Sequence, residues 1–204
     1  MPDQQNFPTS LTLKGKAMRD RIVESAANLI FQSGARETSL DQVREASGAS
    51  KSQIYHYFLD KDALIHAVID LQAQRILASE QATLSRVNTL ADLNRWIEQV
   101  IQMGELYGRI GGCPLGSLAN ELAPYKDNQR DALMRHLESW RTEIEQTLRR
   151  IAVNEGFGPE FDALGLSYTF LAAIQGGLMF AKLTQSAEML SRSLRQIVDI
   201  LRCK

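Results

Sequence analysis

Apolar residues recur along this chain with the three- and four-residue spacing of amphipathic helices. Glycine and proline break the pattern at Gly34, at Gly48, and in the segments 111–114 and 156–159, where we expect helices to end. No segment shows the alternation of apolar and polar residues that a half-buried strand would need. The pattern therefore predicts an all-α protein.

The length of the predicted helices changes near residue 60. Three short helices end at Gly34, at Gly48 and near Phe58, whereas the helices that follow are longer. The longest, over 128–154, carries one apolar stripe formed by Leu133, Leu137, Trp140, Ile144, Leu148 and Ile151. We expect a flexible arm over 1–13, a small three-helix head over 14–60 and a larger helical body over 61–204.

Two capping boxes frame a short turn in the head. Ser39 can cap one helix with Gln42 reaching back to it, and Ser50 can cap the next with Gln53. The residues between the two helices, 47–49, are small enough for a tight turn. Two short helices joined in this way predict a helix-turn-helix, in which the second helix enters the major groove of DNA.

The second helix of this pair carries many side chains that can contact DNA. Gln53 can pair with adenine, Lys51 can donate to guanine, and Ser52 can contact several bases. Tyrosine, threonine and lysine side chains nearby can donate to phosphate oxygens. The candidate DNA-binding residues are Thr38, Ser39, Ser50, Lys51, Ser52, Gln53, Tyr55, His56, Tyr57 and Lys61. The alternative is three helices that only pack together, with Gln53 used in its cap and His56 merely exposed.

The segment from 19 to 64 resembles the TetR family of bacterial transcriptional regulators. The resemblance is carried by Thr38-Ser39, by the Gly-Ala-Ser-Lys turn at 48–51, by Ile-Tyr-His-Tyr-Phe at 54–58, and by Lys61. It implies an all-helical homodimer, a palindromic operator and release by a small effector. The chain departs from the common family pattern at 43–44 and at 52–53. Because 52–53 lies where bases are read, the operator sequence is not carried over.

One segment of the body resembles a narrower group. Residues 111–122, Gly-Gly-Cys-Pro-Leu-Gly-Ser-Leu-Ala-Asn-Glu-Leu, are similar to a segment in a branch of TetR-like repressors with electrophile- and quinone-responsive members. In some of that branch a cysteine near this position senses reactive chemicals. Pro114 suits the first turn of a helix, whose N-terminal dipole would favour the thiolate of Cys113. The alternative is that Cys113 is a small buried apolar residue.

An effector cavity is expected between the helices of the body. Its candidate lining residues, beside Cys113, are Trp96, Met103, Tyr107, Trp140, Tyr168, Phe170 and Gln175. Each of them could equally be an ordinary core residue. This largely apolar set favours a small apolar or aromatic effector.

A surface for homodimerisation is predicted on two helices of the body. Small residues at spacings of three to five would let two helices approach closely. The candidate interface residues are Leu133, Leu137, Ala173, Gly176, Gly177 and Ala181. The alternative is that the small residues pack inside one subunit.

Composition changes this picture only in part. The net charge of −1 provides no global attraction to DNA, so contact must come from a local basic patch at Lys14, Lys16, Arg19 and Arg21. Two cysteines are too few for a disulfide scaffold, which indicates a reducing cytoplasm. The segment 163–181 carries no charge, but its polar residues favour a buried helix over a membrane span.

The sequence offers no basis for an enzyme. His56, His66 and His136 are far apart along the chain, and no phosphate-binding loop or nucleophile motif is present. We therefore expect no metal, no cofactor and no catalysis. The predicted function is a repressor that a small, largely apolar or electrophilic effector releases from its operator, although an activator is also compatible with the sequence. The alternative is a helical small-molecule-binding protein without an operator.

Overall fold

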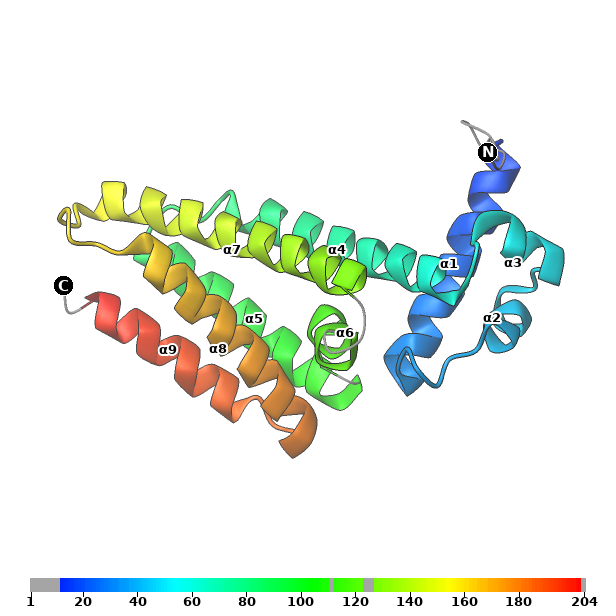
Figure 1. Ribbon diagram of the computed structural model, residues 1–204. Helices are drawn as coiled ribbons and strands as arrows, with labels where there is room; N and C mark the ends of the chain where they lie inside the picture. Colours follow the sequence, from blue (N-terminus) through cyan, green and yellow to red (C-terminus); the bar gives the residue numbers. More distant parts are fainter. Residues whose placement is uncertain (1–11, 111, 123–126, 203–204) are drawn as a thin grey trace. The chain divides into compact units, whose positions relative to one another are not determined.

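The computed structural model describes residues 12–110, 112–122 and 127–202, and this part of the chain contains nine helices and no strand (Figure 1). The prediction of an all-α protein is confirmed. The predicted arm over 1–13 lies outside the described residues except for its last two positions. The chain divides into two compact units, Met1–Val68 and Ile69–Lys204. We use "head" for helices α1 to α3 and "body" for helices α4 to α9.

The head consists of α1 (Leu13–Ser33), α2 (Leu40–Ser47) and α3 (Lys51–Tyr57). Its core is apolar and close to fully buried, with each such side chain contributing about 1.5–3 kcal/mol on burial. The buried residues of these three helices and their turns include Ile22, Val23, Ala26, Ile30, Val43, Ile54 and Phe58. The three-helix head predicted from the sequence is therefore present.

The body consists of α4 (Lys61–Leu84), α5 (Leu90–Ile110), α6 (Pro114–Leu122), α7 (Asp127–Glu155), α8 (Ala163–Thr184) and α9 (Glu188–Arg202). Within it, α8 packs against α5, α7 and α9. The N-terminal part of α4 belongs to the first compact unit and the rest to the second.

The uncharged helix predicted at 163–181 is α8, but it is less buried than the sequence suggested. In the described part of the chain, it is the one helix whose length and composition would allow it to cross a membrane, which is weak evidence for a span. On one face of α8 the side chains of Phe170, Ile174 and Leu178 are buried. On another face Tyr168 and Leu183 are exposed. An uncharged sequence cannot distinguish burial within one chain from burial against a second molecule.

Glycines allow α5, α8 and α9 to approach one another closely at Leu190. A Cβ on Gly177 of α8 would lie 2.6 Å from Leu190 Cδ1 and 2.8 Å from Leu190 Cα. A Cβ on Gly104 of α5 would collide with the other methyl group, Leu190 Cδ2. The side chain of Leu190 is fully buried between them. Small residues on α8 are thus used for packing within one chain.

The C-terminal turns of α7 hold the connection between α4 and α5. Arg150 Nη2 donates to the carbonyl oxygen of Leu84 at 2.6 Å, which satisfies a carbonyl at the end of α4. Asn154 Nδ2 donates to the carbonyl of Asn88 at 2.9 Å. The backbone N–H of Leu90 donates to Glu155 Oε1 at 2.9 Å. These contacts fix the ends of the two helices that carry part of the effector site described below.

Candidate DNA-binding surface and effector site

Both predicted capping boxes are formed in the head. Ser39 Oγ accepts from the backbone N–H of Gln42 at 3.2 Å, and Gln42 Oε1 accepts from that of Ser39 at 2.7 Å. Ser50 and Gln53 repeat the arrangement at 3.2 and 2.8 Å. Between them Gly48 has φ = 65°, a left-handed conformation that glycine adopts without strain. The turn that orients α3 is therefore specified by local hydrogen bonds.

The two faces of α3 have different environments. Ile54 is 2 % exposed and Phe58, which follows the helix, is 3 % exposed, so both anchor it in the head. The guanidinium of Arg19 lies over the Phe58 ring, 5.4 Å from its centroid. Four predicted DNA-contacting side chains are exposed on the helix, namely Lys51, Ser52, Tyr55 and His56. This surface has the donors and the orientation that a recognition helix requires.

Three of the predicted DNA-contacting residues also make contacts inside the head. Thr38 is 4 % exposed and its Oγ1 donates to the carbonyl of Gly34 at 2.8 Å, so a phosphate contact from Thr38 does not fit this structure. Lys61 Nζ donates to the carbonyl of Arg36 at 2.9 Å. Gln53 Oε1 is engaged in its capping box, which leaves the Nε2 group as its donor toward a base.

A half-buried carboxyl group in the body, that of Glu80 on α4, lies beside two tryptophans and was not predicted from the sequence as a site residue. Trp96 Nε1 donates to Glu80 Oε2 at 3.0 Å. Trp140 Nε1 is buried and completes no hydrogen bond in the described structure, yet it is close enough to Glu80 to act on its pKa. Burial raises the pKa of Glu80, and the two indole N–H groups oppose that effect only in part. The signal in the sequence is Glu80 itself, which continues the stripe of Ala73 and Leu77 on α4 where an apolar residue is expected.

Several of the predicted effector-site residues surround this carboxyl group or lie near it. The rings of Trp96 and Phe170 are 6.0 Å apart, centroid to centroid. Gln175 Nε2 donates a hydrogen bond to Cys113 Sγ at 3.7 Å. Gly116 leaves space for that amide, because a Cβ there would be 2.5 Å from Gln175 Oε1. The structure thus places Trp96, Trp140, Phe170 and Cys113 in the interior of the body, with the half-buried Gln175 beside Cys113.

Cys113 stands directly before α6 as predicted, but its environment does not activate it. The side chain is 7 % exposed, and burial is the main effect, raising the pKa of the thiol. The backbone N–H of Gly116 donates to Sγ at 3.5 Å and lowers the pKa of the thiol, but by less than burial raises it. The charge of nearby Glu80 raises this pKa further. The expected thiolate at a helix N-terminus is therefore not favoured here, because desolvation outweighs the hydrogen bonds of the first turn.

The remaining predicted effector-site residues lie elsewhere. Met103 is 44 % exposed, and Tyr168 is 54 % exposed with the Arg141 guanidinium 5.0 Å from its ring centroid. Tyr107 lies in α5, but its side chain is outside the described residues. Met103 and Tyr168 therefore do not belong to the buried cluster around Glu80.

The predicted dimer-interface residues are divided between the core and the surface. Leu133, Gly177 and Ala181 are buried within the single chain, and Leu137 and Ala173 are half-buried. A Cβ on Gly176, by contrast, would meet nothing within 4 Å. Gly176 belongs to an open, mostly apolar row on α8, which we call the α8 stripe and which comprises Leu164, Tyr168, Ala172, Gly176, Met179 and Leu183.

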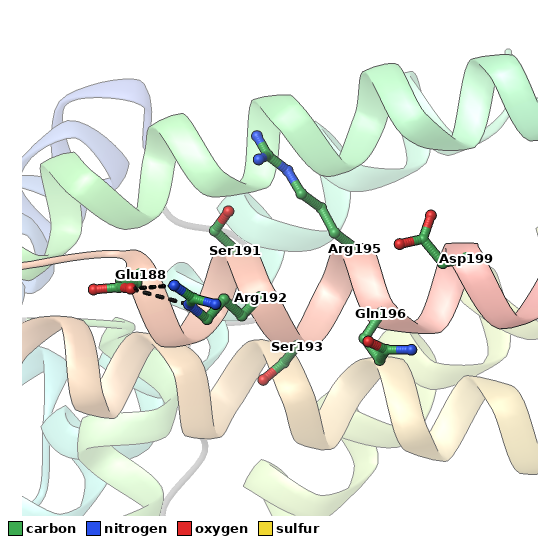
Figure 2. Close-up of a pocket in the computed structure, with 7 residues that line it drawn as sticks. All are labelled: Glu188, Ser191, Arg192, Ser193, Arg195, Gln196 and Asp199. Carbon is green, nitrogen blue, oxygen red and sulfur yellow. Dashed lines mark hydrogen bonds and ion pairs between the residues drawn. The ribbon is translucent and has the colours of Figure 1, made fainter.

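Among the described residues of the body, two of the surface hollows lie on α9 and at the junction of α4 and α5. One, of about 790 Å³, follows α9 and is lined by polar side chains, with Arg192 and Glu188 paired at 2.8 Å (Figure 2). The other, of about 340 Å³, lies where α4 ends and α5 begins, and Trp96 is among its lining residues. No group of three potential metal ligands was found among the described residues.

Both parts of the chain match models of one protein family. Residues 22–68 match the model for bacterial regulatory proteins of the tetR family. Residues 89–197 match the tetracyclin repressor-like C-terminal domain. The chain belongs to the TetR family. It is a DNA-binding transcriptional regulator, as the helix-turn-helix in its sequence predicts, and not the alternative binding protein without an operator.

Individual members of the TetR family match most of the chain. The transcriptional repressor ComR of Escherichia coli is 28% identical over 178 residues, which are 84% of this chain and 83% of ComR. A TetR regulator structure from Chloroflexus aurantiacus is 24% identical with a TM-score of 0.80, covering 94% of this chain and 97% of that one. The reduced form of Escherichia coli NemR is 19% identical with a TM-score of 0.78, covering 88% and 95%. These two structures support the fold.

Proposed function

We propose that this TetR-family regulator is a cytoplasmic, homodimeric repressor that a small, largely apolar or electrophilic effector releases from a palindromic operator. The observation that carries the DNA-binding part is the division of α3 into a buried face and a donor-rich exposed face. The body supports the effector part, because it encloses polar groups that its own residues satisfy only in part. We assign the protein no catalytic role.

Specific contacts to DNA follow from the placement of side chains on α3. Lys51, Ser52 and the free Nε2 group of Gln53 are assigned to base edges. Tyr55 and His56, which are exposed further along the helix, are assigned to phosphate oxygens, with Tyr57 beside them half-buried. Ser39 and Ser50 act through their caps, which position the helix.

A second copy of the chain is proposed to cover the α8 stripe. An exposed apolar row of this length is unusual on the surface of a protein that remains a monomer. Two copies related by a twofold axis would cover each other's stripe and present two heads to one operator. The heads must then match half-sites about 34–36 Å apart, or a multiple of that spacing.

Release is proposed to be a shift between two conformations of the dimer. Glu80, Trp96 and Trp140 bring together α4, α5 and α7, so an effector bound there would act on three helices. Of these, α4 also contains Lys61, which holds the α1–α2 connection through Arg36. Effector binding that displaces α4 would favour the conformation whose heads no longer match the operator.

An electrophile could act through Cys113 instead. The related NemR structure is described as a reduced form, which concerns that protein. In this chain the raised pKa of Cys113 means that a reactive compound would first have to open the first turn of α6. This route therefore requires a conformational change before the covalent step.

A gel-shift titration against the DNA upstream of the gene tests the proposal. The wild type should bind a discrete palindromic site, and Lys51→Ala should lose sequence preference, with about 1–3 kcal/mol less discrimination at one base pair. Arg192→Ala, an exposed change on α9, is the control and should bind as the wild type does. Binding with no sequence preference by the wild type would contradict an operator-specific repressor.

A further inference from the structure

Among the residues of the body that the structure describes, Glu80 has no lysine, arginine or histidine within ion-pair distance of its carboxyl group. Its nearest polar neighbours are the indole N–H of Trp96 at 3.0 Å and the indole of Trp140. A carboxylate offers about four acceptor positions, so these two donors do not fill them all.

The surroundings of Glu80 are aromatic and mostly buried. Trp96 is 2 % exposed, Trp140 is 4 % exposed, and Phe170, which packs against Trp96, is fully buried. Burial without a counter-charge costs free energy for an ionised carboxyl group, which is why its pKa is raised. A positive charge placed beside Glu80 would remove that cost.

The cluster is open to solvent at Glu80, which is half-buried, whereas Trp96 is 2 % exposed. Trp96 contacts Glu80 through its indole N–H and is among the lining residues of the hollow of about 340 Å³ at the end of α4. A small molecule could therefore reach this group from solvent at Glu80 itself.

We propose that Glu80, Trp96 and Trp140 recognise the positively charged nitrogen of an effector whose remaining atoms are apolar or aromatic. The inference rests on the proposed function, since it names the chemical class of the effector that would release the operator. It accounts for three features that packing alone does not require: an acid in an apolar stripe, two tryptophans beside it, and no cation near it among the described residues. A neutral effector that accepts a hydrogen bond from protonated Glu80 is the competing chemistry.

Matched probes separate the two chemistries. Phenyltrimethylammonium carries a permanent positive charge, and tert-butylbenzene has nearly the same shape without it. The chain contains two tryptophans, which are the two that flank Glu80, so intrinsic fluorescence reports binding at this cluster. Titrations of the full-length protein with each probe give the ratio of the two dissociation constants.

The wild type should bind the cation about tenfold more tightly than the neutral probe, because only the cation is attracted by the Glu80 carboxylate. Glu80→Gln keeps the shape and a hydrogen-bond acceptor but removes the charge, so this preference should disappear. Glu160→Gln removes one charge from the exposed connection between α7 and α8 and should leave the preference unchanged. Circular dichroism checks that each variant is folded.

Three results would overturn the inference: no preference for the cation in the wild type, an unchanged preference in Glu80→Gln, or no binding of either probe. If Glu80→Gln fails to fold, Glu80→Leu takes its place, because leucine continues the apolar stripe of Ala73 and Leu77 and should also abolish the preference. Gel shifts without probe test operator binding by itself, so they distinguish a failure of the proposed effector class from a failure of the proposed repressor function. A protein that binds its operator but has no preference for the cation disproves only the effector class.

Discussion

The head and the body of this protein satisfy their polar groups in different ways. In the head, Ser39 and Ser50 bond to residues three positions away, and Thr38 bonds back to Gly34. In the part of the body that the structure describes, the buried amide of Gln129 has no hydrogen-bond partner, and the half-buried Glu80 has no counter-charge. The head is complete in itself, whereas the body contains groups that a ligand could satisfy.

This difference separates two tasks of a ligand-responsive regulator. A DNA-reading surface benefits from a rigid frame that presents donors in fixed positions, and short-range hydrogen bonds provide it. An effector site must be more stable with its ligand than without it, so incompletely satisfied buried groups are an advantage there. Stability is therefore expected to respond differently to substitutions in the two regions.

The largest effect is expected where α8 and α9 meet in the body. Gly177→Ala places a Cβ 2.6 Å from Leu190 Cδ1 and 2.8 Å from Leu190 Cα, which should cost about 1–3 kcal/mol or more in the free energy of unfolding. Within one chain Gly176→Ala is the matched control, because its Cβ meets nothing within 4 Å and the change improves helix propensity. A loss of stability in this variant would instead report contact with the second copy proposed to cover the α8 stripe. Urea denaturation of both variants measures the difference, and equal stabilities would show that α9 can shift to accommodate a methyl group.

A smaller effect is expected from the caps of the head. Ser50→Ala removes the hydroxyl group that accepts a hydrogen bond from the backbone N–H of Gln53. This change should lower the free energy of unfolding by about 1 kcal/mol. Operator affinity should fall as well, since this cap begins the recognition helix. Ser193→Ala, an exposed position on α9, serves as the comparison. Calorimetry measures the stability of Ser50→Ala, and gel shifts measure its operator affinity. If neither changed, packing alone would orient α3.

Glu80→Gln should stabilise the body while it removes a functional group. The folded-state pKa of Glu80 is raised, so the carboxyl group favours folding in its protonated form and loses that contribution as pH rises through the folded pKa. The variant should therefore melt at a higher temperature than the wild type at neutral pH. The difference should shrink below the ordinary glutamate pKa. A variant that is less stable at every pH would show that the ionised carboxylate holds the two indoles in place.

The smallest structural change tests the thiol. In a Cys203→Ser background, Cys113 is the remaining cysteine, and N-ethylmaleimide should label it at least about tenfold more slowly than free cysteine at neutral pH. The reasons are its raised pKa and its 7 % exposure. Labelling in urea provides the unprotected rate. Rapid labelling of the folded protein would instead support the reactive thiolate that the sequence predicts at the start of α6.

Features set by nearby residues could be predicted from the sequence. The helices, both capping boxes and the burial of Ile54 and Phe58 follow from spacing and from side chains three or four positions apart. The burial of Trp96, Trp140 and Phe170 could also be expected, since large aromatic residues in a helical protein tend to be interior. Their grouping around one acid was not predicted, because that acid lies in a different helix.

What the sequence determined by itself is an all-helical regulator with a helix-turn-helix, because helical periodicity and end caps are local properties of the chain. What only the tertiary structure decided is how equivalent residues are used. Gly176 and Gly177 are neighbours in sequence, yet one is open and the other receives Leu190. Cys113 lies at the start of a helix, where a thiol can be activated, but burial raises its pKa. Burial depends on helices brought together from distant parts of the chain, and burial sets both the packing of a glycine and the pKa of an acid or a thiol.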